Sequence, residues 1–337
     1  MHVYENFSLS AYNSFGLDVK TSHFTHLRQA EELSPLLLHN YAPIFILGGG
    51  SNVLFVHDFQ GLVIHNQIEG ISVVKDKNGK AVVEAGGGVN WHRLVLWCLD
   101  RNLGGIENLS LIPGTAGAAP IQNIGAYGVE LKDVFYELEA MELATGKLHR
   151  FKHSECQFAY RNSIFKQELK GKLLITRVWL ELTSSHHQLN TSYGAISSTL
   201  AEQGINKPDI RAVSNAVIQI RTEKLPDPKE IGNAGSFFKN PEIPKEHFDD
   251  LQKKFPAVVH YPGSNGQIKV PAGWLIEQCG WKGKRVGNVG CYQHQALVLV
   301  NYGGAQGQEI WDLAQRIIQS VDEKFGIKLT PEVNILV

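Results

Sequence analysis

Residues 112–128, with the sequence IPGTAGAAPIQNIGAYG, combine small residues with amide side chains in one uninterrupted segment. Glycine and proline both oppose helix interiors, so an ordinary helix is excluded here. The segment also carries isoleucines and Tyr127, which a flexible linker would lack. We therefore predict a fixed, close-fitting loop whose backbone N–H groups approach an anionic ligand such as a phosphate.

A second glycine-rich segment lies upstream, where the apolar run Ile44–Leu47 leads into residues 48–52, GGGSN. A lone turn of this kind is usually only a turn, but two of them suit a ligand with a pyrophosphate at its centre. Neither has the G-x-G-x-x-G spacing of the Rossmann fold, so a dinucleotide-like cofactor in a different fold is predicted. The candidate cofactor-binding residues of the two loops are Gly48, Gly49, Gly50, Ser51, Asn52, Gly114, Thr115, Gly117, Ala118, Gln122, Asn123, Gly125, Ala126 and Tyr127.

A polar group at Tyr160-Arg161-Asn162-Ser163 lies between apolar stretches. An arginine in such a place is most often a surface charge. Together, however, a guanidinium fork and several hydrogen-bonding side chains are what carboxylate binding needs. Both interpretations of Arg161 stay open on the residues alone.

Two further residues are candidates for chemistry in the C-terminal third of the chain. Ser236 follows Gly235 and precedes two phenylalanines, which predicts a hydroxyl in a tight, partly apolar pocket, although a loop serine is usually a turn residue. No G-x-S-x-G elbow is present, so acyl transfer is not favoured. Glu332 lies in an otherwise apolar strand-like stretch, where it either faces solvent or points into a site in which desolvation would raise its pKa.

Composition excludes several classes of protein. The 337 residues are 43% hydrophobic with a formal net charge of -1, which is typical of a globular protein and does not indicate a nucleic-acid or membrane-surface partner. The first twenty residues lack the apolar core of a signal peptide, and no apolar run approaches the ~18 residues of a bilayer span. The four cysteines lack C-x-x-C spacing and the histidines lack H-E-x-x-H. We expect a cytoplasmic monomer without a bound metal.

The elements that must position these residues are mainly short strands in the first two thirds of the chain. Strands are predicted at Ile44–Leu47, Leu62–His65, Ile71–Val74, Ala81–Ala85, Leu173–Leu182, Ala212–Arg221, Gln295–Val300 and Thr330–Val337, and Lys77-Asn78-Gly79 is predicted to be a hairpin turn. Helices are predicted after an Asn90 cap, from Ala272 to Cys279 and from Gly307 to Phe325, and the first and last of these have an apolar stripe that forms core. Leu225-Pro226-Asp227-Pro228 predicts a domain boundary.

Several of these motifs, taken in order, resemble one family. They are residues 112–128, Tyr160–Ser163, residues 224–228 (KLPDP), residues 235–241 (GSFFKNP), residues 272–277 (AGWLIE) and Pro331-Glu332-Val333. Together they look like UDP-N-acetylenolpyruvoylglucosamine reductase, the flavoenzyme of peptidoglycan precursor synthesis, and the resemblance spans essentially the whole chain. Residues 190–194 (NTSYG) are similar to the substrate-covering tyrosine loop of its type I branch.

The resemblance implies an α+β fold of the vanillyl-alcohol-oxidase flavin type, with a two-part FAD-binding module and a C-terminal α+β substrate-binding domain. Residues 1–67 and 327–337 would form the first FAD-binding subdomain and residues 68–225 the second. Residues 226–326 would form the substrate-binding domain. FAD would be held without a covalent bond.

The implied reaction is the NADPH-dependent reduction of UDP-N-acetylglucosamine enolpyruvate to UDP-N-acetylmuramate. Flavin N5 would deliver a hydride to the enolpyruvyl group, whose carboxylate Arg161 and a protonated Glu332 would stabilise, and Ser236 would then supply a proton. The resemblance carries over Tyr160, Tyr193, Lys224 and Asn240 as contacts to the UDP-sugar, and Arg221 as a residue near the flavin.

Two rival interpretations remain on the sequence. Another flavin oxidoreductase of the same fold, such as an alcohol oxidase, often holds flavin covalently through His or Cys near the first glycine-rich loop, and residues 48–52 contain neither. A nucleotide-sugar-binding protein without redox chemistry would keep Lys224 and Tyr193 but would not need the flavin loops.

Overall fold

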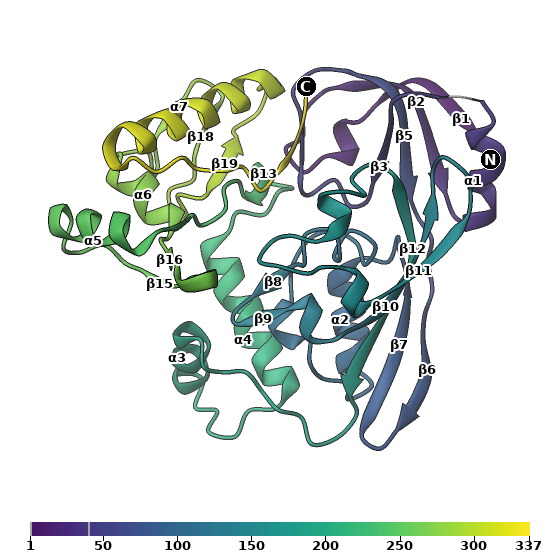
Figure 1. Cartoon of the computed structure of the whole chain (residues 1–337), viewed down its shortest axis with the longest axis horizontal. Coiled ribbons are helices and arrows are strands. Elements are labelled where there is room, and N and C mark those ends of the chain that lie inside the picture. The colour runs from purple at the N-terminus through teal and green to yellow at the C-terminus, as the bar shows by residue number, and fades with distance from the viewer. Residues whose placement is uncertain (1, 40) are drawn as a thin grey trace. The chain divides into compact units, whose positions relative to one another are not determined.

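The computed structural model describes residues 2–39 and 41–337, and the chain forms two compact units (Figure 1). Unit 1 comprises residues 1–7, 21–50 and 60–223, and unit 2 comprises residues 8–20, 51–59 and 224–337. The predicted division into residues 1–67 with 327–337, 68–225 and 226–326 stays a prediction. In the described part of the chain, no helix is long and apolar enough to cross a membrane.

Unit 1 contains two sheets. The smaller has the order β1-β2-β5-β3, with β3 parallel to β5, and the larger is antiparallel with the order β11-β10-β12-β7-β6. The strands of the smaller sheet are β1 (Val3–Ser8), β2 (Lys20–Leu27), β3 (Ile44–Leu47) and β5 (Phe59–Asn66). Those of the larger sheet are β6 (Ile71–Lys77), β7 (Lys80–Gly86), β10 (Phe135–Glu142), β11 (Leu148–Lys152) and β12 (Leu173–Thr183).

Helix α2 (Trp91–Leu99), labelled in Figure 1, contributes its buried apolar residues to the core of the larger sheet. The Asn90 side chain accepts a hydrogen bond from the Arg93 N–H at 2.9 Å, which confirms the predicted cap. The predicted hairpin turn is also confirmed, because Asn78 and Gly79 join β6 to β7 with φ of 57° and 77°. Unit 1 also contains α1 (Leu33–Leu37), α3 (Gly194–Glu202), α4 (Ile210–Lys224) and the two-stranded pair β8 (Gly125–Ala126) and β9 (Val129–Glu130).

The predicted strand Ala212–Arg221 is wrong, because these residues lie in α4. Its buried positions include Ile210, Val213, Val217 and Ile220, which recur at the three- and four-residue spacing of a helix. The many β-branched residues favour a strand, but burial of this face decides the outcome.

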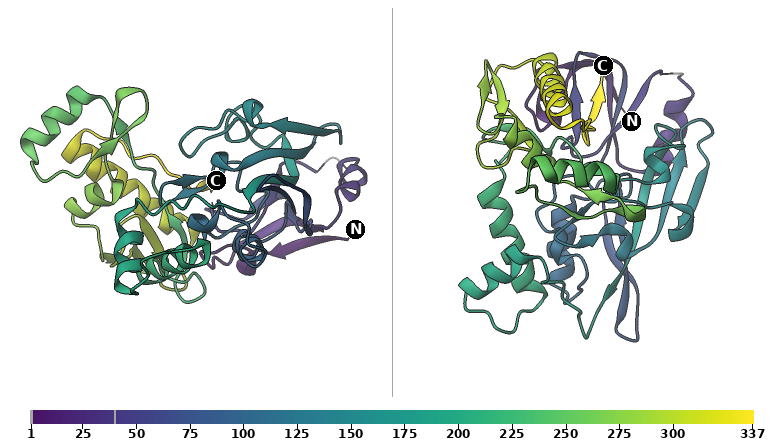
Figure 2. Two further views of the ribbon diagram at one scale, coloured as in Figure 1. Left: turned by 90° about the horizontal axis from the view of Figure 1, so that it is seen from below. Right: turned by 60° about the vertical axis from the view of Figure 1, so that its left-hand side comes forward.

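Unit 2 contains a sheet of order β13-β19-β18-β17, and α7 (Gly307–Phe325), yellow in Figure 2, lies beside β18 and β19. This helix has the predicted bounds and ends at Gly326 in the left-handed conformation. Helix α6 (Ala272–Gln278) confirms the second predicted helix. The remaining elements are β4 (Val53–Phe55), β13 (Gly232–Ser236), β14 (Glu242–Ile243), α5 (Lys245–Lys254), β15 (Tyr261–Pro262), β16 (Ile268–Lys269), β17 (Arg285–Val286), β18 (Val289–Cys291), β19 (Val298–Asn301) and β20 (Asn334–Leu336).

The last strand returns to the body of its unit, as predicted. β20 pairs in parallel with β4, and Asn334 donates from its N–H and its side-chain amide to the Asn52 carbonyl at 3.1 and 3.0 Å. Two strands differ in their bounds from the prediction. β19 begins at Val298, after the predicted start at Gln295, and β20 begins at Asn334, after the predicted start at Thr330. Glu332 therefore lies in an extended segment before the strand and not within it.

Candidate active site

The two glycine-rich loops of unit 1 pack against each other. A Cβ at Gly49 would lie 3.0 Å from the Gly114 Cα, and one at Gly48 would lie 2.6 Å from the Thr115 Oγ1 and 3.6 Å from the Ala118 Cβ. The approach therefore requires residues without side chains at these positions. Two adjoining glycine-rich segments fit the phosphates of an elongated cofactor, because small residues let a ligand come close to the backbone.

A third glycine-rich segment, Gly86-Gly87-Gly88, packs against the long glycine-rich loop. Gly117 donates to the Gly87 carbonyl at 2.9 Å, and a Cβ at Gly117 would lie 2.8 Å from that oxygen. This triplet is not among the cofactor-binding residues predicted from the sequence. The sequence contains a pattern that could have identified the triplet, because Gly86-Gly87-Gly88 follows an apolar strand as Gly48–Gly50 does.

The end of the long loop forms a tight hairpin between β8 and β9. Its two turn residues, Tyr127 and Gly128, have φ of 51° and 80°, a conformation that few tyrosines adopt. The buried Asn108 donates to the carbonyls of Tyr127 and Asn190 at 3.0 and 2.8 Å, and so fastens the predicted tyrosine loop to this hairpin. The Tyr193 ring, 49% exposed, packs edge-on against the Tyr127 ring at 5.2 Å.

Two arginines bring positive charge to this region of unit 1. The Arg221 side chain, from α4, interacts electrostatically with Tyr127, and its Nε is buried and has no hydrogen-bond partner among the described residues. Burial, and then the charge of Arg161, lower the pKa of Arg221, whereas Tyr127 opposes this shift. Burial likewise raises the pKa of Tyr127. Arg161 and Arg221 are close enough for the charge of one to affect the other, and two neighbouring positive charges fit an anionic ligand.

Arg161 occupies a two-residue turn closed by reciprocal backbone hydrogen bonds between Ala159 and Asn162, at 3.0 and 3.1 Å. Its φ is 52°, and its Nη2 donates to the Gly125 carbonyl at 2.6 Å. A Cβ at Gly125 would lie 3.1 Å from the Arg161 Nη1, so this glycine leaves room for the guanidinium. Tyr160, the other turn residue, has its ring 5.7 Å from the guanidinium carbon.

In unit 2, Ser236 ends β13 after an irregularity in the pairing with β19. The buried Asn233 accepts from the Gly235 N–H at 3.0 Å, and Gly235 has φ of 66°. Ser236 is exposed, whereas the phenylalanines at 237 and 238 are buried. The expected apolar pocket around the hydroxyl is thus not formed by these rings, because they belong to the core.

The segment that holds Glu332 runs directly beside Ser236. The Glu332 backbone N–H donates to the Phe237 carbonyl at 2.8 Å, and the Lys239 backbone N–H donates to the Thr330 carbonyl at 3.0 Å. Unit 2 therefore places two of the three predicted catalytic residues on adjoining backbone segments, with Glu332 half-buried. The sequence does not reveal this proximity, because the residues are nearly a hundred positions apart.

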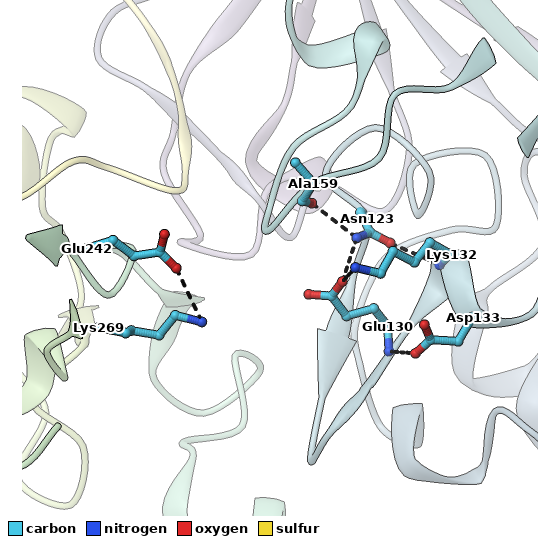
Figure 3. Close-up of polar contacts among 7 residues, drawn as sticks. All are labelled: Asn123, Glu130, Lys132, Asp133, Ala159, Glu242 and Lys269. Atoms are coloured by element: carbon cyan, nitrogen blue, oxygen red, sulfur yellow. Dashed lines mark hydrogen bonds and ion pairs between the residues drawn. The ribbon is translucent and has the colours of Figure 1, made fainter. Parts of the chain in front are cut away.

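The other residues predicted to bind the substrate or the cofactor lie on separate elements and differ in their exposure. Asn240 accepts from the Ala272 N–H at 2.9 Å, at the start of α6, whereas Lys224 is exposed at the end of α4. Near Asn240, on β14 and β16, Glu242 and Lys269 form a largely buried ion pair at 3.6 Å (Figure 3), which sequence reasoning missed. Ser51, Asn52, Gln122 and Ala126 are half-buried, and Gly50 is buried. In the described residues, no cluster of three or more His, Cys, Asp or Glu side chains could hold a metal.

Comparison with known proteins assigns both parts of the chain. The C-terminal domain model of UDP-N-acetylenolpyruvoylglucosamine reductase matches residues 227–336, and an FAD binding domain model matches residues 25–152. The UDP-N-acetylenolpyruvoylglucosamine reductase of Flavobacterium johnsoniae is 49% identical over 337 residues, which is 100% of both chains. The chain belongs to the UDP-N-acetylenolpyruvoylglucosamine reductase family. The Pseudomonas aeruginosa reductase is 46% identical over 338 residues, covering 99% of each chain.

A solved structure agrees with this reductase family at the level of the fold. The Thermus caldophilus UDP-N-acetylenolpyruvylglucosamine reductase matches with a TM-score of 0.69 and 22% identity, over 100% of this chain and 98% of that one. The predicted fold class, an α+β FAD-binding module of the vanillyl-alcohol-oxidase type followed by a reductase C-terminal domain, is confirmed. The chain is an FAD-dependent oxidoreductase of this family. The glycine-rich loops and the buried Arg221 Nε fit a cofactor that carries phosphates.

Proposed function

We propose that this reductase uses NADPH to convert UDP-N-acetylglucosamine enolpyruvate into UDP-N-acetylmuramate, with Arg161, Ser236 and Glu332 as its catalytic residues. Bound FAD would supply the hydride that passes from NADPH to the terminal enolpyruvyl carbon. The observation that carries the proposal is the hydrogen bond from the Glu332 N–H to the Phe237 carbonyl, which puts an acid and a hydroxyl on adjoining segments.

Arg161 and Glu332 would stabilise the negative charge that spreads into the substrate carboxylate. The guanidinium is a permanent cation whose position is fixed by Gly125 at 2.6 Å, so little reorganisation is needed when charge develops. Glu332 contributes only as a protonated hydrogen-bond donor, because a carboxylate would repel the developing charge. Both groups therefore act most strongly in the transition state.

Ser236 would donate its hydroxyl proton to the carbon next to the carboxylate. A hydroxyl is a weak acid near neutral pH, but a carbanion is basic enough to accept from it. The exposed position of Ser236 at the end of β13 leaves the hydroxyl accessible to a substrate. Tyr160, Tyr193, Lys224 and Asn240 would contact the UDP-sugar, with Lys224 as a point charge for phosphate and Tyr193 as a cover.

The experiment is anaerobic flavin absorbance during the two half-reactions. NADPH should bleach the flavin, and UDP-N-acetylglucosamine enolpyruvate should restore its colour. Ser236→Ala should still bleach with NADPH but recover far more slowly, whereas Ser10→Ala, another exposed serine, should match the unaltered protein. Recovery at the normal rate in Ser236→Ala would remove the proton-donor role, and bleaching without any recovery in the unaltered protein would remove the sugar substrate.

A further inference from the structure

Asn123 lies at the centre of a hydrogen-bond network that the proposed chemistry does not use (Figure 3). Its side chain is fully buried, and its amide donates to the Glu130 Oε2 at 3.0 Å and to the Ala159 carbonyl at 3.1 Å. Its Oδ1 accepts from the Lys132 N–H at 3.0 Å. Glu130 in turn is paired with the Lys132 Nζ at 2.8 Å.

The orientation of this amide is unambiguous. The Glu130 carboxylate and the Ala159 carbonyl can only accept, and the Lys132 backbone N–H can only donate. A flipped amide would oppose all three partners. Both amide hydrogens are therefore used within the protein, which leaves the side chain no donor for a cofactor, although the sequence predicted a cofactor contact here.

Among the partners of Asn123, Ala159 is the one that links it to the catalytic residues, because Ala159 is the first residue of the turn that contains Arg161. Arg161 has φ of 52°, a strained conformation for a residue other than glycine, which persists only when its surroundings fix it. Three hydrogen bonds between this part of the chain and residues 121–125 do so. They join Asn123 to Ala159, Ser163 Oγ to the Ile121 carbonyl at 2.6 Å, and Arg161 Nη2 to the Gly125 carbonyl.

We propose that Asn123 is a positioning residue that acts through Ala159 to hold the Arg161 guanidinium where the substrate carboxylate binds. The inference rests on the proposed function, because it needs Arg161 to contact that carboxylate. Without the amide, the turn loses one of its three hydrogen bonds to residues 121–125, and the guanidinium can move away from Gly125. Misplacement of a catalytic group by about 1 Å can slow a reaction by roughly 100-fold, so the sugar-dependent step should slow by about 10- to 100-fold.

The test is a double-mutant cycle of Asn123→Gly with Arg161→Ala, read out as the single-turnover rate of flavin reoxidation by the enolpyruvyl sugar. Glycine suits position 123 because Asn123 has φ of 45°, so the amide is removed without adding backbone strain. Asn123→Gly alone should slow reoxidation, retain FAD and keep its rate of reduction by NADPH. In the Arg161→Ala background it should slow reoxidation no further.

Asn13→Ala is the matched control, because Asn13 is also a buried asparagine with three hydrogen bonds, to Leu9 and Leu17 of unit 2. Its effect should be the same with and without Arg161. If Asn123→Gly does not fold, Ser163→Ala removes a neighbouring fastening and should show the same dependence on Arg161.

The inference is overturned if the effects of Asn123→Gly and Arg161→Ala multiply within about twofold, as independent sites do. It is also overturned if Asn123→Gly loses FAD, since the amide would then serve the cofactor. Failure of the proposed function is distinguishable, because the unaltered protein itself would not be reoxidised by the sugar.

Discussion

Replacing Gly117 by alanine should destabilise unit 1 by an amount that the structure allows to be estimated. The new Cβ would lie 2.8 Å from the Gly87 carbonyl oxygen, 2.9 Å from the Gly87 Cα and 3.1 Å from the Ile175 carbonyl oxygen. All three atoms belong to the backbone, so no side chain can rotate away. Ordinary contact for a Cβ starts at 3.4 Å, and the loop would therefore retreat by roughly 0.6 Å.

That retreat would stretch the hydrogen bond from Gly117 to the Gly87 carbonyl, which is 2.9 Å long, to the limit of a useful bond. Overpacking costs about 1–3 kcal/mol, and the weakened bond adds about 1 kcal/mol. In a domain of roughly 150–250 residues, each 1 kcal/mol lowers Tm by about 2–4 °C. Gly117→Ala should thus lower Tm of the FAD-free protein by roughly 4–16 °C, measured by circular dichroism.

Gly194→Ala is the matched control, because a Cβ at Gly194 meets nothing within 4 Å and its φ is not positive. Its free energy of unfolding should change by less than about 0.5 kcal/mol. If Gly117→Ala shifts Tm no more than Gly194→Ala does, the close approach of the two glycine-rich segments is refuted.

Three further predictions follow from single contacts. Tyr127→Phe should weaken FAD binding by about tenfold, measured by quenching of flavin fluorescence, because the buried Arg221 loses its electrostatic interaction with the Tyr127 hydroxyl; unchanged affinity would contradict this. Asn90→Ala should lower the free energy of unfolding by about 1 kcal/mol in urea through loss of the α2 cap; an unchanged midpoint would argue against the cap. Burial, and then His26, lower the pKa of His65 to about 4, so the unfolded chain takes up its proton first. The stability from His65 is complete above pH 6.5 and is lost as pH falls towards 4, a slope that should flatten in His65→Gln.

Local patterns predicted the elements that are themselves local. The α7 helix has a long apolar stripe and a glycine at its end, and both bounds were predicted. The Asn78-Gly79 turn needs only two residues with positive φ, which the sequence supplies. The predicted strand Ala212–Arg221 is wrong because β-branched residues favour a strand locally, whereas the buried positions of α4 follow a helical period.

The candidate site was predictable in residue type but not in arrangement. The glycine-rich loops were found from composition, yet the contact of Gly49 with Gly114 joins residues that only the folded sheets bring together. The role inferred for Asn123 depends on Ala159, 36 positions away. No pattern around Asn123 distinguishes an amide that faces a cofactor from one that fastens a turn.

The discontinuity of unit 2 has a consequence for the order of folding during synthesis. All residues of unit 1 have been synthesised once Glu223 has left the ribosome. β4 of unit 2, in contrast, can pair with β20 only after residues 334–336 have been synthesised. Asn301 likewise donates to the Phe15 carbonyl across 286 positions. Domains fold as units and N-terminal ones fold first, so β4 would emerge early yet lack its partner strand until residues 334–336 have been made. The nascent chain would therefore carry an unpaired β4 for the time between completion of unit 1 and synthesis of β20.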